Sequence, residues 1–134
     1  MGSNVQQLRP NLFGCRILIV EDEFFIAADL ADALLELGAE VVGPIPTLAQ
    51  AVEALCGARL DGAVLDVNLH GEMVWPVVEE LLARDVPITL ATGYTGEVIP
   101  PAYAHLPVVE KPCSAWELSR IVAARAAVGQ GFSP

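Results

Sequence analysis

Several polar side chains with chemical potential follow directly after apolar runs of the sequence. These runs span residues 17–20, 62–65, 86–91 and 106–109. In an open α/β sheet, the carboxyl ends of parallel strands border the crevice in which ligands bind. If the runs are neighbouring parallel strands, the residues that follow them should share one pocket. The predicted pocket contains Glu21, Asp22, Asp66, Thr92 and Lys111.

The acidic members of this set predict a magnesium site. Mg²⁺ takes one or two carboxylates, keeps several waters and completes its shell with phosphate oxygens. Asp22 and Asp66 are expected to be direct ligands, with Glu21 acting through water. The backbone carbonyl of Asn68, just past the strand end, is expected to supply a further oxygen.

Asp66 is the expected nucleophile of a phosphoryl transfer. With a cation bound, its carboxylate can attack phosphorus and form an acyl phosphate. The hydroxyl of Thr92 would donate to one phosphoryl oxygen, and the ammonium of Lys111 would lie against another.

Each of these residues also has an ordinary interpretation. Asp22 could cap a helix, and Asp66 could cap the turn that follows it. Thr92 could belong to a simple turn, and Lys111 could be a solvated lysine. Their joint occurrence after the first, third, fourth and fifth predicted strands favours a site over four unrelated features.

The apolar periodicity predicts the elements that position this set. The predicted strands are 16–20, 40–42, the strand that ends at Asp66, 86–91 and 107–110. The predicted helices are 23–37, one that opens with a capping box at Thr47 and stops at Gly57, 73–84, and one from a capping box at Ser114 to about 128. Segment 94–106 contains Pro100-Pro101, so any helix there should be short or broken.

Strands that alternate with helices predict a doubly wound α/β fold, a five-stranded parallel sheet flanked by helices. We expect residues 1–13 to be a flexible lead-in, 14–128 the domain and 129–134 a tail. At 134 residues, 54% of them hydrophobic, the chain suits one domain with a buried sheet.

Composition excludes several classes of function. A formal net charge of -10 argues against direct binding to nucleic acid. No apolar stretch is long enough to span a membrane, so we expect a cytoplasmic protein without membrane contact. Cys15, Cys56 and Cys113 have no metal-binding or redox spacing and are expected to be small core residues in a reducing compartment.

Over residues 15–128 the chain resembles the response-regulator receiver domain of two-component signalling. The segments that carry the resemblance are Ile17-Leu18-Ile19-Val20-Glu21-Asp22-Glu23, Val64-Leu65-Asp66-Val67-Asn68-Leu69, Thr92-Gly93 and Val109-Glu110-Lys111-Pro112. The resemblance implies strand order 2-1-3-4-5, Asp66 as phosphoacceptor, a sensor histidine kinase as donor and a cis Lys111-Pro112 bond. It also implies a phospho-accepting switch with self-catalysed phosphorylation and dephosphorylation rather than an enzyme.

Within that family, Leu90-Ala91-Thr92-Gly93-Tyr94 is similar to the group nicknamed FATGUY, with Leu90 in the place of Phe. Members of that group are often single-domain receivers paired with HWE-type kinases. The resemblance therefore implies a stand-alone receiver that acts on a downstream protein or phosphotransferase and could form a homodimer. A receiver fragment of a longer regulator is the alternative.

The chain departs from the family pattern at one switch position. Receivers commonly carry Tyr or Phe three residues before the lysine, and here that residue is Val108. A valine cannot report phosphorylation by swinging a ring inward. We therefore expect Tyr94, or segment 94–106, to move when Asp66 is phosphorylated. His70 is close to Asp66 in the chain and is expected to be a bystander.

Three other functions fit the sequence less well. A Mg²⁺-dependent phosphohydrolase usually needs a second acid two residues after the nucleophile, where this chain has Asn68. A flavodoxin-like cofactor binder needs a phosphate loop after the first strand, where Glu21 and Asp22 would repel the phosphate. A receiver-like module that binds without phosphorylation is disfavoured by the full set of site residues.

Overall fold

The computed structural model describes residues 11–57, 59–93 and 99–129, with side chains up to residue 126. Within them a five-stranded parallel sheet has the order β2-β1-β3-β6-β7. The strands are β1 (Arg16–Val20), β2 (Glu40–Ile45), β3 (Gly62–Asp66), β6 (Ile88–Thr92) and β7 (Val108–Glu110). Counted along the chain, this order is the expected 2-1-3-4-5, so the predicted fold class is confirmed.

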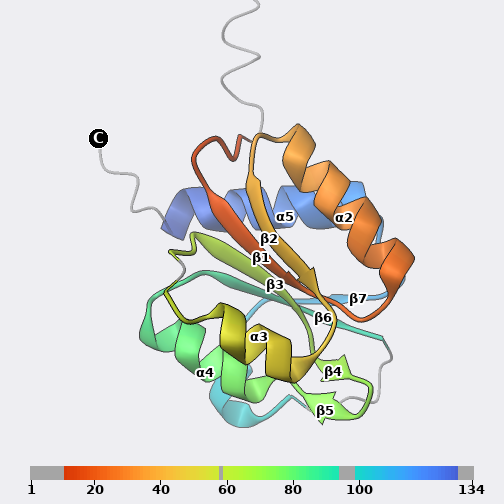
Figure 1. Ribbon diagram of the computed structural model, residues 1–134, viewed down its shortest axis with the longest axis vertical. Coiled ribbons are helices and arrows are strands. Elements are labelled where there is room, and N and C mark those ends of the chain that lie inside the picture. The colour runs from red at the N-terminus through yellow and green to blue at the C-terminus, as the bar shows by residue number, and fades with distance from the viewer. Residues whose placement is uncertain (1–10, 58, 94–98, 130–134) are drawn as a thin grey trace, which may run out of the picture.

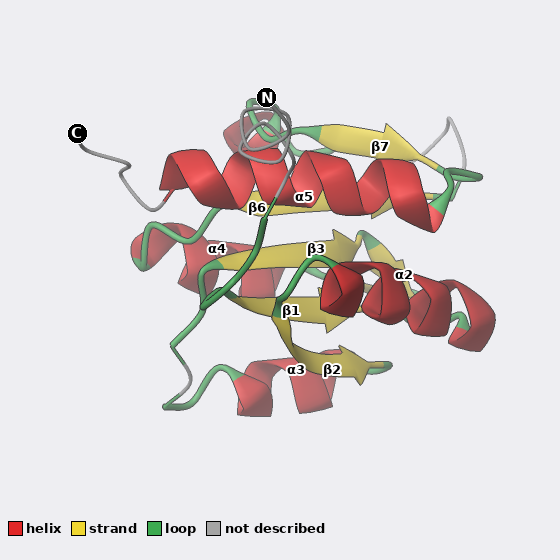
Figure 2. Cartoon of the chain, turned by 90° about the horizontal axis from the view of Figure 1, so that it is seen from above, coloured by secondary structure: helices red, strands yellow, loops and turns green. Residues whose placement is uncertain are grey.

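Helices cover both faces of the sheet (Figures 1 and 2). α2 (Phe24–Glu36) and α5 (Ala115–Gly129) pack on one face, and α3 (Leu48–Ala54) and α4 (Trp75–Ala83) pack on the other. Each pair closes over its own apolar cluster, with Leu34 and Val122 in one and Val77 and Leu81 in the other. Strands buried on both faces explain the nearly continuous apolar runs of the sequence.

Side-chain caps begin two of the helices, as the sequence predicts. The backbone N–H of Gln50 donates to Thr47 Oγ1 at 3.2 Å, and that of Glu117 donates to Ser114 Oγ at 3.0 Å. The N-cap of α2 is Glu23, whose side chain makes no capping bond. Its carboxylate is therefore available for another contact.

A hairpin follows the Asp66 strand, and the sequence analysis did not predict it. β4 (Asn68–Leu69) pairs antiparallel with β5 (Glu72–Met73). The two connecting residues both have positive φ, 52° at His70 and 93° at Gly71, as a type I′ turn requires. Because Met73 pairs in this hairpin, α4 begins at Trp75 rather than at 73.

Several smaller expectations need correction. Leu12, assigned to the flexible lead-in, is fully buried, and its N–H donates to the carbonyl of Leu37 at 2.8 Å. Of the expected core cysteines only Cys15 is buried, whereas Cys56 is exposed. The large side chain of Trp116 on α5 is also exposed.

Two further features complete the fold. Segment 99–106 contains a single turn of 3₁₀ helix, η1 (Pro101–Tyr103), which agrees with the expected short or broken helix. The Lys111-Pro112 bond is cis, as the family resemblance implies, and so is Gly43-Pro44. No helix among the described residues is long and apolar enough to cross a bilayer.

Candidate functional site

The carboxyl ends of three adjacent strands place the candidate site at one edge of the sheet. β3 lies between β1 and β6, and Asp66, its last residue, pairs with Ala91 of β6. Glu21 and Asp22 follow β1, whose Val20 pairs with Leu65. In Figure 2 the arrowheads of β1, β2, β3 and β7 point toward this edge, where the β4–β5 hairpin also lies in Figure 1.

Four carboxylates converge at this edge. Their ligand oxygens all lie within 4.8 Å of one another, and they belong to Glu21, Asp22, Glu23 and Asp66. Glu21 and Asp66 are buried, whereas Glu23 is exposed. Carboxylate oxygens this close repel one another unless a cation lies among them. The donor set and its spacing fit a hard divalent cation such as Mg²⁺.

Lys111 supplies the positive charge that this structure shows among these acids. Its Nζ lies 2.8 Å from Glu21 Oε1, 3.1 Å from Asp66 Oδ2 and 3.2 Å from Glu23 Oε1. The backbone holds Lys111 in place, because its N–H donates to the carbonyl of Thr92 at 2.8 Å. The ammonium therefore lies directly beside the expected phosphoacceptor.

Burial and neighbouring charges shift the pKa values of Asp66 and Lys111. Burial, together with the neighbouring charge of Glu21, raises the pKa of Asp66 to about 7, although Lys111 and the N–H of Asn68 act in the opposite direction. Burial alone lowers the pKa of Lys111, but its contacts with Glu21 and Asp66 outweigh this and raise it. Lys111 is therefore charged at neutral pH, while the carboxyl of Asp66 is held near its titration midpoint.

The remaining predicted site residues occupy different positions. Thr92 is buried at the end of β6, one residue beyond the partner of Asp66. The N–H of Asn68 donates to Asp66 Oδ1 at 3.2 Å, which also gives Asp66 the turn-capping contact of its ordinary interpretation. Val108 is 42% exposed on β7, and Tyr94 lies outside the described residues.

Two residues without an assigned role also reach the site. Glu23 contacts Lys111, and its own N–H donates to Glu21 Oε2 at 3.0 Å. The type I′ turn brings His70 Nε2 within 3.2 Å of Asp22 Oδ2. Glu23 could have been noted from its place in the Glu21-Asp22-Glu23 run, and the hairpin from the His70-Gly71 pair between two potential strands.

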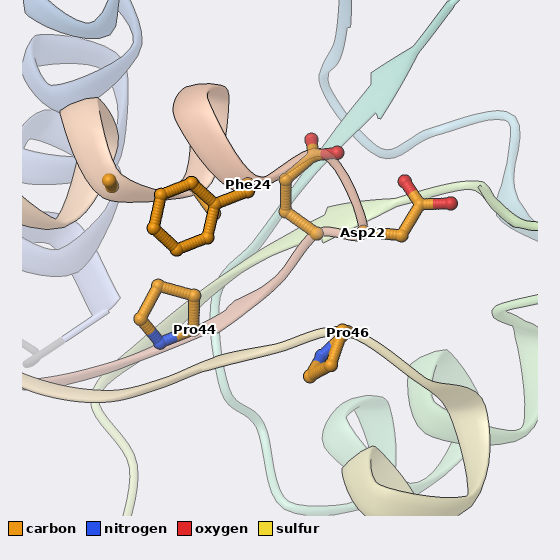
Figure 3. Close-up of a pocket in the computed structure, with 7 residues that line it drawn as sticks. Asp22, Phe24, Pro44 and Pro46 are labelled. Atoms are coloured by element: carbon orange, nitrogen blue, oxygen red, sulfur yellow. The ribbon is translucent and has the colours of Figure 1, made fainter.

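A mainly apolar groove of about 280 Å³ opens beside the acids, between the start of α2 and the end of β2 with the residue that follows it. In Figure 3, the rings of Phe24 and Pro44 face each other across it, and the carboxylate of Asp22 lies toward its far end. Ala27, Ala28 and Pro46 complete its apolar lining. Phe24 and Phe25 are both largely exposed, so the first turn of α2 presents an apolar surface next to the site.

The chain was compared with known proteins. No family model matches it. It is 35% identical over 115 residues to the phyllosphere-induced regulator PhyR of Methylorubrum extorquens, a match that covers 79% of this chain and 41% of that regulator. The chain therefore spans less than half the length of this relative.

Two solved structures match over nearly their whole length. SdrG from Sphingomonas melonis Fr1 is 39% identical, with a TM-score of 0.70, over 81% of this chain and 94% of that chain. The receiver domain of the sensor histidine kinase PA1611 from Pseudomonas aeruginosa is 26% identical, with a TM-score of 0.71, over 85% of this chain and 98% of that chain. That domain holds a magnesium ion in its active site cleft.

The fold, the residues at the strand ends and these matches all point to the same family. The sheet has the receiver strand order, and the acids, Thr92 and Lys111 follow its strands in the receiver pattern. SdrG is 39% identical to this chain, and the match covers 94% of the SdrG chain. The chain belongs to the response-regulator receiver family.

Proposed function

We propose that this chain is a phospho-accepting switch in which Asp66 receives a phosphoryl group in a Mg²⁺-dependent reaction. The observation that carries the proposal is the contact of 3.1 Å between Lys111 Nζ and Asp66 Oδ2, at the carboxyl end of a central strand. A carboxylate held beside a fixed ammonium can serve as the nucleophile, and the ammonium can then stabilise the phosphoryl oxygens.

The proposed step transfers a phosphoryl group from a histidine of a sensor kinase. A carboxylate oxygen of Asp66 attacks phosphorus, and the bond from phosphorus to the histidine nitrogen breaks with its electron pair going to nitrogen. Thr92 and Lys111 donate hydrogen bonds to the phosphoryl oxygens as Asp66 becomes an acyl phosphate. Water later hydrolyses the acyl phosphate, so the domain resets without acting as an enzyme on another molecule.

The four clustered carboxylates support a role for Mg²⁺ in this step. One ammonium cannot neutralise four acids, so a divalent cation suits the remaining charge. Asp22 and Asp66 would hold the ion directly, Asn68 through its carbonyl and Glu21 through water. Bound there, Mg²⁺ would neutralise part of the phosphoryl charge. Both oxygens of Glu21 already accept contacts from Lys111 and from the Glu23 N–H, which supports its indirect role.

The partners follow from the same proposal. We infer that this protein is cytoplasmic and that its phosphoryl donor is a sensor histidine kinase, of the HWE type that the FATGUY resemblance implies. The output would be a change in affinity for a downstream protein or phosphotransferase. The similarity to PhyR, a regulator, and to a receiver domain of a histidine kinase supports such partners. The stand-alone role and a homodimer stay predictions.

Intact-mass spectrometry after incubation with Mg²⁺ and acetyl phosphate tests the proposal. One phosphoryl adduct is expected on the chain, and it should be absent in Asp66→Asn and after chelation of the metal. Asp32→Asn is the matched control, because it makes the same loss of charge on the exposed side of α2. It should still form the adduct. A folded protein that forms no adduct would contradict the proposal and favour a module that binds without phosphorylation.

A further inference from the structure

The ammonium of Lys111 is fully engaged in this structure. A lysine ammonium has three N–H donors, and three carboxylates lie within 3.2 Å of Nζ. They belong to Glu21, Asp66 and Glu23. A phosphoryl oxygen can therefore receive a hydrogen bond from Lys111 only after one of these carboxylates has moved away.

The three partners differ in how easily they can leave. The side chains of Glu21 and Asp66 are each 6% exposed, whereas that of Glu23 is 59% exposed. Glu21 is also held by the N–H of Glu23, and Asp66 is the acceptor itself. Glu23 has the longest of the three contacts, at 3.2 Å. Exposed ion pairs contribute at most about 1 kcal/mol, so this contact is the cheapest to break.

We propose that Glu23 is a positioning residue whose carboxylate accepts the Lys111 N–H that the phosphoryl group needs. This carboxylate is displaced when the phosphoryl group arrives. The inference rests on the proposed function and adds a residue to it. The incoming phosphoryl group and the Glu23 carboxylate are both anions, so they compete for one N–H and repel each other. Only the side chain of Glu23 must swing out, because its backbone N–H can keep its hydrogen bond to Glu21 Oε2.

This competition should slow the phosphorylation of Asp66. The cost equals the free energy of the contact between Glu23 and Lys111, which corresponds to about a two- to fivefold change in rate. Glu23→Gln removes the carboxylate and keeps the N–H that holds Glu21. Glu36→Gln makes the same change of charge at the exposed far end of α2 and is the matched control.

The test measures phosphorylation rate constants by intact-mass spectrometry at saturating Mg²⁺, with acetyl phosphate and with the less negatively charged phosphoramidate as donors. Glu23→Gln should react about two- to fivefold faster than the unaltered chain with both donors, and Glu36→Gln should react at the unaltered rate. Glu23→Asp keeps the charge but shortens the side chain by one methylene, so it should lose the contact and also react faster.

Several outcomes would overturn the inference alone. Equal rates for Glu23→Gln and the unaltered chain would show that Glu23 does not compete. Acceleration only with acetyl phosphate, or an unaltered rate in Glu23→Asp, would show that Glu23 merely repels the donor. No adduct on the unaltered chain from either donor would instead overturn the proposed function, and this inference with it.

Discussion

Lys111 Nζ lies 2.8 Å from Glu21 Oε1, closer than to Asp66 Oδ2, the proposed phosphoacceptor group, at 3.1 Å. Glu21 therefore acts first as the buried counter-ion of Lys111. An aspartate at this position would have a carboxylate one methylene further from the ammonium. The longer side chain lets Glu21 neutralise Lys111 while Asp22 stays beside Asp66 in the acidic cluster.

Substitution Lys111→Met should destabilise the fold without metal. It leaves Glu21 and Asp66 buried without their counter-charge, and breaking a buried ion pair from one side costs about 3–5 kcal/mol. Urea unfolding at pH 8 in chelator measures this loss. Added Mg²⁺ should recover part of it, because the ion supplies positive charge to the same carboxylates.

Glu80→Gln is the control for this substitution, since it removes the more exposed pair of 2.8 Å with Arg84 on α4. Its expected cost is below about 1 kcal/mol, and Mg²⁺ should not alter it. Equal losses in the two variants would contradict a special role of the Lys111 contacts.

Substitution Asp66→Asn should change the pH dependence of stability. The pKa of Asp66 is about 7 in the folded state, against an ordinary value of 3.8. Between pH 3.8 and pH 7, Asp66 is therefore mostly protonated in the folded state and mostly ionised in the unfolded chain. Stability without metal therefore falls as pH rises through this window. Asparagine cannot ionise, so the variant should gain about 3 kcal/mol relative to the unaltered chain between pH 4.5 and pH 8.

Burial is the largest cause of the raised pKa of Asp66, and the groups that face it modify the shift. Glu21 raises its pKa, whereas Lys111 and the N–H of Asn68 lower it. Thermal or urea unfolding at several pH values in chelator gives the difference in free energy between the variant and the unaltered chain. A difference that does not change with pH would show that Asp66 titrates near its ordinary value.

The strand ends and their acids could be predicted from sequence because they depend on periodicity alone. Strands buried on both faces appear as apolar runs, and a parallel sheet brings their carboxyl ends to one edge. That reasoning places Asp66 and Lys111 in one pocket although they are 45 residues apart, and the structure brings them to 3.1 Å.

The contacts of Glu23 and His70 could not be predicted in this way. Glu23 and Lys111 are 88 residues apart, and their contact depends on the rotamers of two long side chains. His70 reaches Asp22 only because it adopts a positive φ in a tight turn, a conformation that histidine adopts more often than most residues. Both contacts depend on side-chain rotamers or a backbone turn, which the periodicity of the sequence does not determine.

Substitution Gly43→Ala should destabilise both the fold and the site. Gly43 has φ of +109°, and a Cβ there would lie 2.7 Å from the carbonyl oxygen of Ile19 and 2.8 Å from the N of Ile45. Both neighbours are backbone atoms, which cannot move aside cheaply. The expected cost is about 2–4 kcal/mol, measured by urea unfolding.

Gly57→Ala separates backbone strain from the clash. Gly57 has φ of +80°, but a Cβ there meets nothing within 4 Å, so only the strain of about 1–2 kcal/mol applies. Gly43→Ala should also weaken Mg²⁺ binding, since Glu21 is held by the bond of 3.0 Å from its N–H to the carbonyl of Ile45. Equal costs and unchanged metal affinity would contradict this account.

The stacked pair of Trp75 and Tyr103 provides a probe of the expected switch. Their ring centroids are 5.2 Å apart with an interplanar angle of 17°, which ties η1 to the start of α4. If segment 94–106 moves on phosphorylation, this stack should open or shift, and the emission of Trp75 should change. The second tryptophan, Trp116, is exposed beside Arg120 and would add a background signal.

Fluorescence of Trp116→Phe therefore isolates Trp75. Its emission should change on addition of acetyl phosphate with Mg²⁺ and return as the acyl phosphate hydrolyses. Tyr103→Phe retains the stacked ring and should keep the response, whereas Tyr103→Ala should abolish it and cost about 1–2 kcal/mol of stability. An unchanged Trp75 signal, with the adduct verified by mass, would show that η1 stays in place and that Tyr94 or Val108 must be tested separately.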